Sequence, residues 1–348
     1  MSATPLVSVI VLNYNGKQFL KTCFDSLLRS GYPEIELILA DNASTDDSLA
    51  FMREHYPTVA LIETGSNSGY SGGYNFAVPR ANGRYAVLLN NDVEVTPGWL
   101  QPLVAEMEAS PRVAACQPKI RHLINRDQFE YAGASGGFID RYGFPFLRGR
   151  VLDTLETDSG QYDDRSDLFW ASGAALMVRV SDYAAAGGLD ADFIHHMEEI
   201  DLCWRWLLTG HSLRVVPDSL IYHFAGGTIK PDSYMKMYWN HRNSIIMLWK
   251  NYSAGNLVRV LPVRMALDLV LILKSLVTLD FKRLLAVPMA YLWLLGHLPL
   301  LWRKRRGVQA MRTVTDGEIA PLMLPGSLVI AYYLWGKKTF SQLWRGTQ

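Results

Sequence analysis

PLVSVIVLNYNGKQFLKTCFDSLLRSGYPEIELILADNAS, residues 5–44, contains an apolar run, a helical repeat and a second apolar run in succession. The first run is rich in β-branched residues and ends at Asn13 and Gly16, which predicts a buried strand followed by a turn. The middle segment has apolar residues at helical spacing and stops at Gly31 and Pro33, which predicts a helix. A strand, a helix and a second strand in this order predict a parallel sheet.

The same alternation continues along the chain to about residue 92. DDSLAFMREHY predicts a second helix, and VALIETG and RYAVLLNND predict further strands joined by a Gly-rich connection. The predicted fold class is therefore α/β, a doubly wound, Rossmann-like sheet that binds ligands beyond the carboxyl ends of its strands. Asn13, Asp41 and Asp92 lie at three of these strand ends, so we expect them to face one crevice.

Beyond this point the pattern is less regular until residue 170. Residues 110–170 predict hairpins and loops, and WASGAALMVRV predicts a strand. GGLDADFIHHMEEIDLCWRWLLTGH predicts a helix from about Glu198 to Leu208 that stops at Gly210. LRVVPDSLIYHFAGG predicts two short strands, of which the second ends at His223.

The distribution of charged residues divides the chain into two parts. Residues 1–254 contain 21 Lys/Arg against 29 Asp/Glu, and residues 255–348 contain 13 against 4. We expect a catalytic domain over residues 1–250 and a basic, apolar helical region over residues 251–348 that attaches to a membrane surface. Nucleic acid is not an expected partner, because the basic residues alternate with apolar helices.

Three dispersed cysteines without metal-ligand spacing predict neither disulfides nor zinc and fit a reducing compartment. 

The segment LLAVPMAYLWLLGHLPLLW, residues 284–302, has 19 positions without a formal charge and basic residues on both flanks. This length is close to the ~20 residues that a spanning helix needs. Pro288, His297 and Pro299 disfavour a simple span, so we expect in-plane or re-entrant attachment, with a true span as the alternative. A buried core helix would leave the RKRR flank unexplained.

An acidic turn follows the strand predicted around residue 88, in LLNNDVEVTPGWL. In an extended strand Asn90, Asp92 and Glu94 would point the same way and offer adjacent oxygen ligands. Mg²⁺ or Mn²⁺ suits such a set when substrate phosphates complete the coordination. A solvated strand end is the alternative. Asp41, at the end of its own strand, could hydrogen-bond a nucleobase or a ribose.

The segments VSVIVLNYNG, LILADNASTDDS, NSGYSGGYN, ANGRYAVLLNNDVEVTPGWL, WASGAALMVRV and GGLDADFIHHMEEIDLCWRWLLTGH occur in a recognisable order. In this order the chain resembles the inverting family 2 glycosyltransferases of the GT-A fold, and in particular their bacterial rhamnosyltransferase-like branch. The resemblance covers about residues 6–250, and the basic, apolar tail resembles the membrane-associating tails of that branch. The resemblance to this family implies that the sheet is a mixed sheet of the GT-A type.

The resemblance also implies how the donor and the metal ion are bound. The Asp-x-Asp motif of the family falls on Asn90, Asn91 and Asp92, so Asp92 is the implied metal ligand, and Asn90 removes one charge. His223 and Glu94 are the further metal candidates. The implied donor-binding residues are Asn13, Asp41, Asn67, Gly69, Asn90 and Asn91.

The catalytic base of the family lies in an acidic pair followed by x-Asp-Leu, which matches Glu198, Glu199 and Asp201 here. Glu199 stands where Asp is usual, and the choice of base among the three stays open. The base would deprotonate an acceptor hydroxyl that attacks the anomeric carbon opposite the diphosphate. Acidic residues in a first helical turn also favour the helix dipole, which is the structural alternative. For the acceptor, the resemblance implies the small residues Gly173 and Ala174, with Trp170 as a stacking surface.

The expected function is an inverting glycosyltransferase at the cytoplasmic face of a bacterial plasma membrane. It would transfer a sugar, with dTDP-L-rhamnose the favoured donor, to a lipid-linked saccharide in surface polysaccharide synthesis. A sugar-nucleotide pyrophosphorylase would need a Gly-rich basic loop, and NYNGKQFL offers one glycine and one lysine. A membrane-tethered, non-catalytic nucleotide-sugar binding or scaffold protein is the other alternative.

Overall fold

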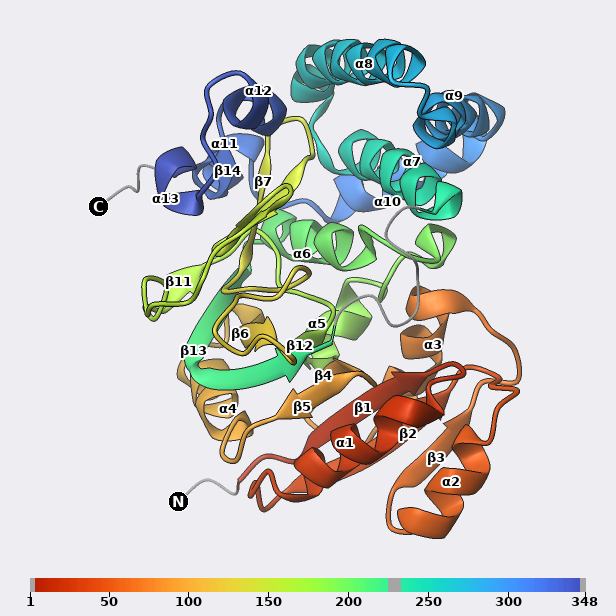
Figure 1. Cartoon of the computed structure of the whole chain (residues 1–348), viewed down its shortest axis with the longest axis vertical. Coiled ribbons are helices and arrows are strands. Elements are labelled where there is room, and N and C mark those ends of the chain that lie inside the picture. Colours follow the sequence, from red (N-terminus) through yellow and green to blue (C-terminus); the bar gives the residue numbers. More distant parts are fainter. Residues whose placement is uncertain (1–3, 225–232, 345–348) are drawn as a thin grey trace.

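The computed structural model describes residues 4–224 and 233–344 of the chain. Figure 1 shows an α/β part at the bottom, built on one large sheet, and a helical part at the top. Buried apolar side chains form one cluster on each face of the large sheet, since Ile10 belongs to one cluster and its neighbours Val9 and Val11 to the other. The sheet is therefore the centre of a two-sided core.

Nine strands of the described residues form the large sheet, in the order β11-β13-β6-β12-β4-β1-β2-β3, with β5 paired to β13. The strands are β1 (Val7–Asn13), β2 (Ile35–Asp41), β3 (Ala60–Glu63), β4 (Tyr85–Asn90), β5 (Val93–Val95), β6 (Val113–His122), β11 (Ser166–Asp167), β12 (Ala175–Arg179) and β13 (Ser212–His223). Strands β1 to β4 are parallel, whereas β12 runs antiparallel to both β4 and β6. The sheet is mixed and curls where β13 crosses to β5 (Figure 1).

Helices cover both faces of this sheet. The buried residues of α1 (Lys17–Leu28), α2 (Ser48–His55) and α4 (Leu100–Ala109) join one apolar cluster. Those of α3 (Gly69–Ala77), α5 (Val180–Ala185) and α6 (Glu198–Leu208) join the other. The doubly wound α/β arrangement expected from the sequence is confirmed.

The register of the parallel strands aligns their carboxyl ends. Asn13 pairs with Asp41 across β1 and β2, and Leu12 pairs with Asn90 across β1 and β4. The polar residues that end these strands therefore meet at one edge of the sheet, as expected. The prediction of two short strands between Leu213 and His223 was wrong, because the structure has the single strand β13 there, with a register irregularity between Val216 and Leu220.

A second sheet of five strands lies between the large sheet and the C-terminal helices, in the order β10-β9-β8-β7-β14. Its strands are β7 (Gly137–Asp140), β8 (Pro145–Leu147), β9 (Arg150–Val151), β10 (Thr154–Leu155) and β14 (Met323–Leu324). The hairpins expected in residues 110–170 are present in β7 to β10. Strand β14 comes from the C-terminal region and pairs with β7, so the chain interlocks across the predicted domain boundary at residue 250.

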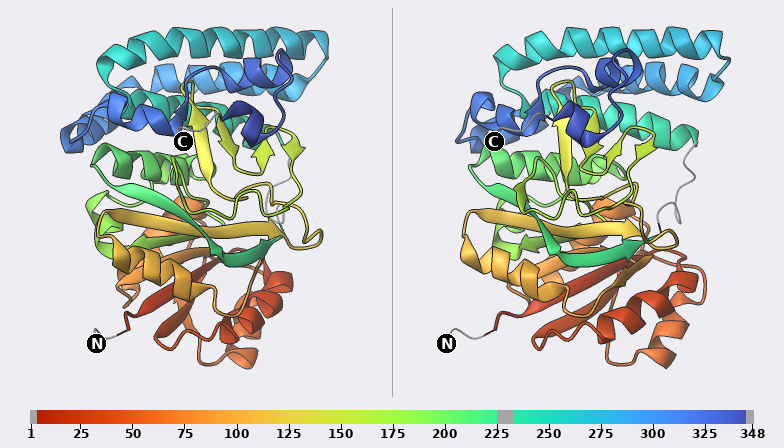
Figure 2. Two further views of the ribbon diagram at one scale, coloured as in Figure 1. Left: turned by 90° about the vertical axis from the view of Figure 1, so that its left-hand side faces the viewer. Right: turned by 60° about the vertical axis from the view of Figure 1, so that its left-hand side comes forward.

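The C-terminal part consists of helices stacked on α6. They are α7 (Tyr234–Asn251), α8 (Ala254–Val277), α9 (Phe281–Gly296), α10 (Leu298–Met311), α11 (Asp316–Ile319), α12 (Leu328–Tyr333) and α13 (Phe340–Leu343). The described residues also form short 3-10 turns, of which η1 (Val78–Arg80) and η2 (Ala191–Phe193) lie earlier in the chain and η3 (Ala320–Leu322) lies among these helices. Figure 2 shows α8 and α9 as the outermost layer of the molecule.

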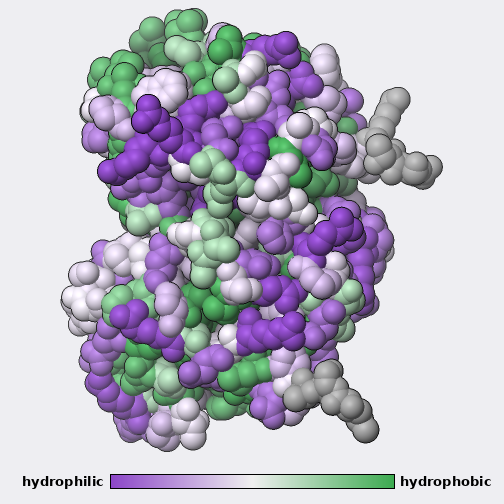
Figure 3. All heavy atoms as spheres, turned by 180° about the vertical axis from the view of Figure 1, so that it is seen from behind, coloured by the Kyte–Doolittle hydropathy of each residue, from purple (hydrophilic) through white to green (hydrophobic). Residues whose placement is uncertain are grey.

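Helix α8 is oriented with polar side chains inward and apolar side chains outward. Arg264, Asp268 and Ser275 are buried, and Leu269 and Leu273 are more than half exposed. We call the exposed apolar side chains of the two helices the α8–α9 outer face; it comprises Val258, Met265, Leu269, Val270, Leu273, Leu276, Val277, Phe281, Leu285, Met289, Leu292 and Leu295. Figure 3 shows apolar side chains gathered at this end of the molecule. Soluble helices normally have the opposite arrangement.

None of the helices in the described ranges is by itself long and apolar enough to cross a bilayer. Helices α9 and α10 meet the length and composition test only as a pair, and a 78° bend separates them.

The RKRR flank also has partners within the protein. Lys304 forms ion pairs with Asp190 and Asp192, and Arg305 is buried and donates to backbone carbonyls. The expectation that a buried helix could not account for this flank was therefore wrong for two of its four residues.

Candidate active site

A cavity of about 510 Å³ opens beyond the carboxyl ends of β1 and β4 and extends to α6, α7 and α8. The predicted site residues that line it are Asn67, Gly69, Asn90, Asn91, Asp92, Trp170, Gly173, Ala174, Glu198, Glu199 and His223. These residues come from widely separated parts of the sequence. The fold thus brings most of the predicted donor, metal, acceptor and base residues to one place.

Asn13 and Asp41 form the floor behind the cavity and do not line it. Asn13 donates to the Asp41 carboxylate at 3.2 Å and accepts from Asn91 at 2.7 Å, and the Asp41 carboxylate also accepts from the amide of Ser44 at 2.9 Å. Both side chains are fully buried. In this structure their role is to fix the loops at the strand ends, and a contact of Asp41 with a nucleoside stays a prediction.

The cavity wall next to β2 is formed by Asn42, Asn67 and Gly69. The Asn42 amide donates to the Asn67 side chain and to the Gly69 carbonyl, each at 3.0 Å. Gly69 has φ +70°, and a Cβ there would lie 2.7 Å from the carbonyl oxygen of Ile194. A larger residue at position 69 would displace the loop that leads into α6, so this glycine is a structural requirement of the site. Asn42 was not predicted.

Asp92 and His223 meet where β4 and β13 end. The Asp92 carboxylate lies 3.0 Å from His223 Nε2, and the other ring nitrogen, Nδ1, lies 3.3 Å from the carboxylate of Glu130. Burial lowers the pKa of His223, but the charges of Asp92 and Glu130 outweigh burial and hold that pKa well above its usual range. Asn90 contacts the same Nε2 atom at 3.2 Å. Glu130 is fully buried in the irregular segment and was not predicted.

This arrangement fits a divalent cation with few protein ligands. Within residues 4–224 and 233–344 no group of three or more His, Cys, Asp and Glu side chains could hold a metal ion. Asp92 and His223 nevertheless both line the cavity, where a cation would have to replace the proton on His223 Nε2, and Glu130 lies behind the histidine as carboxylates do behind metal-binding imidazoles. Mg²⁺ and Mn²⁺ sites often take their remaining ligands from substrate phosphates and water.

Glu94 does not belong to the site, and its prediction as a metal candidate was wrong. Strand β4 ends at Asn90, a turn at Asn91 and Asp92 follows, and β5 begins at Val93. The turn breaks the alternation on which the prediction depended. The Glu94 carboxylate forms an ion pair with Arg126 at 2.7 Å and does not line the cavity.

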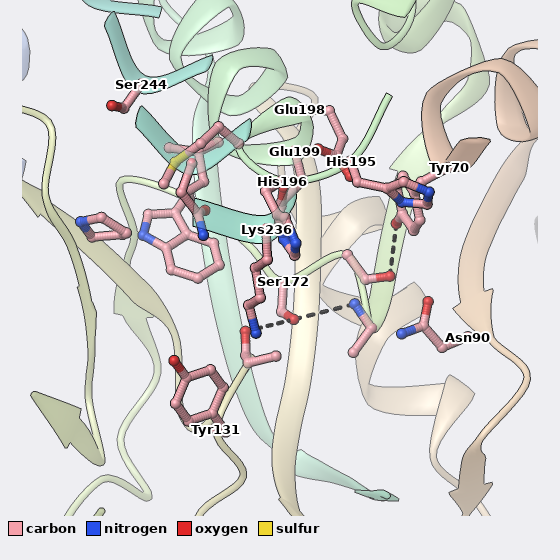
Figure 4. A pocket seen from close by; sticks show the side chains of 18 of the residues that line it. Tyr70, Asn90, Tyr131, Ser172, His195, His196, Glu198, Glu199, Lys236 and Ser244 are labelled. Carbon is pink, nitrogen blue, oxygen red and sulfur yellow. Dashed lines mark hydrogen bonds between the residues drawn. The ribbon is translucent and has the colours of Figure 1, made fainter. Parts of the chain in front are cut away.

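Glu198 and Glu199 begin α6 and line the cavity (Figure 4). In the described part of the chain, the Oε2 atom of each lacks a hydrogen-bond partner. Burial raises the pKa of Glu199 to about 7, and burial together with the charge of Glu199 raises the pKa of Glu198 well above its usual range. Glu198 is 4% exposed, whereas Glu199 is half-buried. Burial therefore disfavours a double negative charge on the pair near neutral pH, and Glu199, the more exposed of the two, is the more accessible carboxylate.

The loop before these carboxylates has an unusual backbone. Ile194, His196 and Met197 have φ values of 61°, 69° and 71°. Such values are costly for residues other than glycine and persist only where neighbours fix them. The side-chain amide of Asn243, on α7, donates to the carbonyls of Phe193, His195 and His196 at 2.8–2.9 Å.

Asp201 is a structural residue, so its inclusion among the candidate bases is corrected. Its carboxylate accepts from Arg205, from Lys250 and from Asn251, each at 2.9 Å, and is fully buried outside the cavity lining. The partners on α7 lie 49 and 50 residues further along the chain. This network ties α6 to α7.

The predicted acceptor residues lie at the cavity, with additional roles. The Gly173 carbonyl accepts from the Tyr70 hydroxyl at 2.7 Å, and a Cβ at position 173 would lie 2.5 Å from the oxygen of the Tyr70 hydroxyl. Gly173 is therefore required for the approach of Tyr70, which was not predicted. Trp170 is 5% exposed and donates from its indole to the Phe138 carbonyl at 2.9 Å, so most of its ring belongs to the core.

Comparison with known proteins agrees with this geometry. Residues 8–162, somewhat less than half of the chain, match the family model described as Glycosyl transferase family 2. It is 25% identical over 268 residues to the N-acetylglucosaminyl-diphospho-decaprenol L-rhamnosyltransferase of Mycobacterium tuberculosis (strain CDC 1551 / Oshkosh), a match that covers 72% of this chain and 86% of that protein. It is 30% identical over 227 residues to the O-antigen biosynthesis protein RfbC of Myxococcus xanthus, covering 63% of this chain and 17% of that protein.

Solved structures show the same fold. GalNAc-T7, crystallised with UDP, GalNAc and Mn²⁺, superimposes with a TM-score of 0.57 at 15% identity over 74% of this chain and 49% of its own. The mannosyltransferase PcManGT from Pyrobaculum calidifontis, in complex with GDP-Man and Mn²⁺, gives 0.52 at 15% identity over 97% of this chain and 89% of its own. The fold is thus α/β and GT-A-like with a curled mixed sheet, and the resemblance to family 2 and its rhamnosyltransferase-like branch is confirmed.

Proposed function

We propose that the protein is an inverting, metal-dependent glycosyltransferase that moves a sugar from a nucleotide diphosphate donor to a lipid-linked saccharide. The observation that carries the proposal is the convergence of the Asp92–His223 pair and the Glu198–Glu199 pair on one cavity. One pair suits a diphosphate with its cation, and the other suits a hydroxyl nucleophile. A binding or scaffold protein has no need of a buried carboxylate whose pKa lies near neutrality.

Glu199 is the proposed base. Its pKa of about 7 lets it hold a negative charge at neutral pH and still accept a proton readily. It would take the proton of the acceptor hydroxyl as that oxygen attacks the anomeric carbon. A single base with direct displacement inverts the configuration at that carbon, because attack occurs opposite the departing diphosphate.

The leaving group is expected at Asp92 and His223. When bound there, Mg²⁺ or Mn²⁺ would supply positive charge that stabilises the departing diphosphate. Asn90 and Asn91 lie beside these ligands and offer neutral hydrogen bonds to the donor. Asn67, Gly69 and the floor residues Asn13 and Asp41 are the proposed nucleoside end of the site.

The donor and the acceptor are proposed by similarity. The mycobacterial relative is named a rhamnosyltransferase that acts on N-acetylglucosaminyl-diphospho-decaprenol. By that similarity we favour dTDP-L-rhamnose as the donor and a sugar linked through diphosphate to a polyprenyl lipid as the acceptor. RfbC, named for O-antigen biosynthesis, supports a place in surface polysaccharide synthesis.

The α8–α9 outer face is the proposed membrane contact. Its exposed apolar side chains cover two long neighbouring helices, and α8 places Arg264 and Asp268 on the inner side. Exposed basic residues, including Arg259, Lys274 and Arg303, accompany this surface and would favour anionic lipid headgroups. We therefore propose in-plane attachment to the cytoplasmic face of the plasma membrane, where a lipid-linked acceptor would be available.

The test is a transfer assay with purified protein. Nucleotide diphosphate sugars, including dTDP-L-rhamnose, are offered with a synthetic GlcNAc-diphospho-lipid in the presence of Mn²⁺, Mg²⁺ or EDTA. We expect one donor to give a disaccharide product with inverted anomeric configuration by NMR, and EDTA to abolish its formation. Donor binding without turnover for every donor and acceptor would instead favour the non-catalytic binding protein, and retained configuration would refute the mechanism.

A further inference from the structure

One end of the cavity is lined by cations and aromatic rings that the proposed chemistry does not use. Arg150 from β9, Lys236 from α7 and Arg264 from α8 reach it, and the Tyr131 ring lies among them. The carboxylates that line the cavity, within the described ranges, are Asp92, Glu198 and Glu199. We call Tyr131, Arg150 and Lys236 the basic lobe.

The two cations of the basic lobe are arranged around a single aromatic ring. The guanidinium carbon of Arg150 lies 3.3 Å from the centroid of the Tyr131 ring, and Lys236 Nζ lies 5.5 Å from the same centroid. Arg150 is held in place because its Nε and Nη1 atoms donate to the carbonyls of Leu152 and Tyr131 at 2.7 and 2.6 Å. A fixed guanidinium and an ammonium group that share one aromatic ring at the cavity wall are well suited to a phosphate ligand.

The basic lobe is separate from the proposed position of the donor diphosphate. In Figure 4, Lys236 reaches down toward Ser172 and Tyr131, and Asn90 lies on the opposite side of Ser172. The same view places Glu198 and Glu199 above these residues. Burial and the charge of Lys236 lower the pKa of His196 to about 3, so this imidazole stays neutral beside the lobe. The lobe therefore offers a second, independent set of positive charges.

The cavity that contains the basic lobe also reaches α8. Arg264 comes from α8, the helix whose outer side is apolar, and its guanidinium donates to Ser244 at 2.9 Å and to Asp268 at 3.0 Å. A lipid-linked acceptor has its lipid in the bilayer and its reactive hydroxyl at Glu199. Its diphosphate must lie between these points, so such an acceptor needs a phosphate-binding group within the cavity that the basic lobe lines.

We propose that Arg150 and Lys236 bind the diphosphate that joins the acceptor saccharide to its lipid. The inference rests on the proposed function and adds an acceptor subsite to it. A diphosphate could also come from the nucleotide donor, so the two sources must be distinguished by experiment. Binding through two charge-assisted contacts makes recognition depend on the diphosphate and not on the sugar.

The experiment measures binding of two probes, decyl diphosphate and dTDP with Mn²⁺, by titration calorimetry. We expect Lys236→Gln and Arg150→Gln each to weaken decyl diphosphate binding by about tenfold or more and to change dTDP binding less than about twofold. Asp92→Asn should show the reverse pattern. Lys21→Gln, which changes an exposed lysine on α1, is the matched control and should affect neither probe.

The outcomes separate this inference from the proposed function, because binding is measured without transfer. Unchanged decyl diphosphate binding in both variants would overturn the inference even if the wild-type protein transfers sugar. Equal weakening of both probes would also overturn it, since the cations would then serve the donor. Thermal melting of each variant checks its fold, and restored decyl diphosphate binding in Lys236→Arg supports a direct charge contact.

Discussion

At the scale of single residues, the environment of each carboxylate determines its chemistry. Asp92 contacts His223, Asp201 is neutralised by Arg205 and Lys250, and Glu199 has no cationic partner of this kind among residues 4–224 and 233–344. Burial raises the pKa of both Asp92 and Glu199, but the charge of His223 outweighs burial at Asp92 and lowers its pKa, whereas the pKa of Glu199 rises to about 7. Three acidic residues that look equivalent in the sequence thus have different functions.

The raised pKa of Glu199 predicts how activity depends on pH. A base must be deprotonated to act, so kcat/KM should fall about tenfold per pH unit below about pH 7 and level off above it. The measurement is the pH profile of kcat/KM for transfer under saturating metal. A profile that is flat from about pH 5.5 to 8 would show that Glu199 is not the titrating base.

The residues that sequence reasoning located are those at the ends of regular strands. Asn13 and Asp92 could be predicted because β-branched runs set the strand ends and parallel register aligns them. Glu130, Tyr131 and Arg150 could not be predicted, since they lie in irregular hairpins whose position depends on the tertiary fold. Their chemistry became evident only from their neighbours in space.

At the scale of elements, α6 and α7 act as one unit that holds the catalytic loop. Asn243 on α7 fixes the three backbone carbonyls before Glu198, and Lys250 and Asn251 on α7 bind Asp201 on α6. The sequence predicted α6 with its correct bounds because its acidic first turn and its stop at Gly210 are local signals. It could not show that Asp201 faces α7, because that contact joins distant segments.

This coupling predicts different effects for two aspartate substitutions. Asp201→Asn should lower the free energy of unfolding by about 3 kcal/mol or more, because it removes the buried carboxylate that pairs with Arg205, while Lys250 keeps its ion pair with Asp190. Asp218→Asn, which removes an exposed ion pair with Arg165, should cost about 1 kcal/mol or less. Chemical denaturation measures both. A stable Asp201→Asn protein that has lost its turnover would instead return Asp201 to the candidate bases.

At the scale of the whole molecule, the cavity is enclosed by both parts of the chain. Arg264 from α8 lines it, and β14 completes the second sheet beside it. The charge asymmetry of the sequence indicated a second role for the C-terminal region, and hydropathy located its apolar stretch. The inverted orientation of α8 could not be derived from composition, because it depends on which side packs against α7.

The α8–α9 outer face predicts reversible binding to membranes. Replacing Leu269, Leu273 and Leu276 together by serine should reduce co-sedimentation with anionic lipid vesicles severalfold, because it removes exposed apolar surface. The melting temperature should change little. Leu28→Ser, which alters an equally exposed leucine on α1, is the control for apolar exposure alone. Unchanged vesicle binding in the triple variant would contradict membrane attachment through this face.

The most direct test of the account compares Glu199→Gln with Glu198→Gln, two neighbouring substitutions of the same size. Donor binding is measured by calorimetry and sugar transfer by product formation for each variant. Glu199→Gln should bind the donor like the wild type and lose transfer by about a thousandfold or more, since it cannot accept the proton. Glu198→Gln, which replaces the more deeply buried carboxyl, should retain most of the transfer activity. Undiminished transfer by Glu199→Gln would contradict the account.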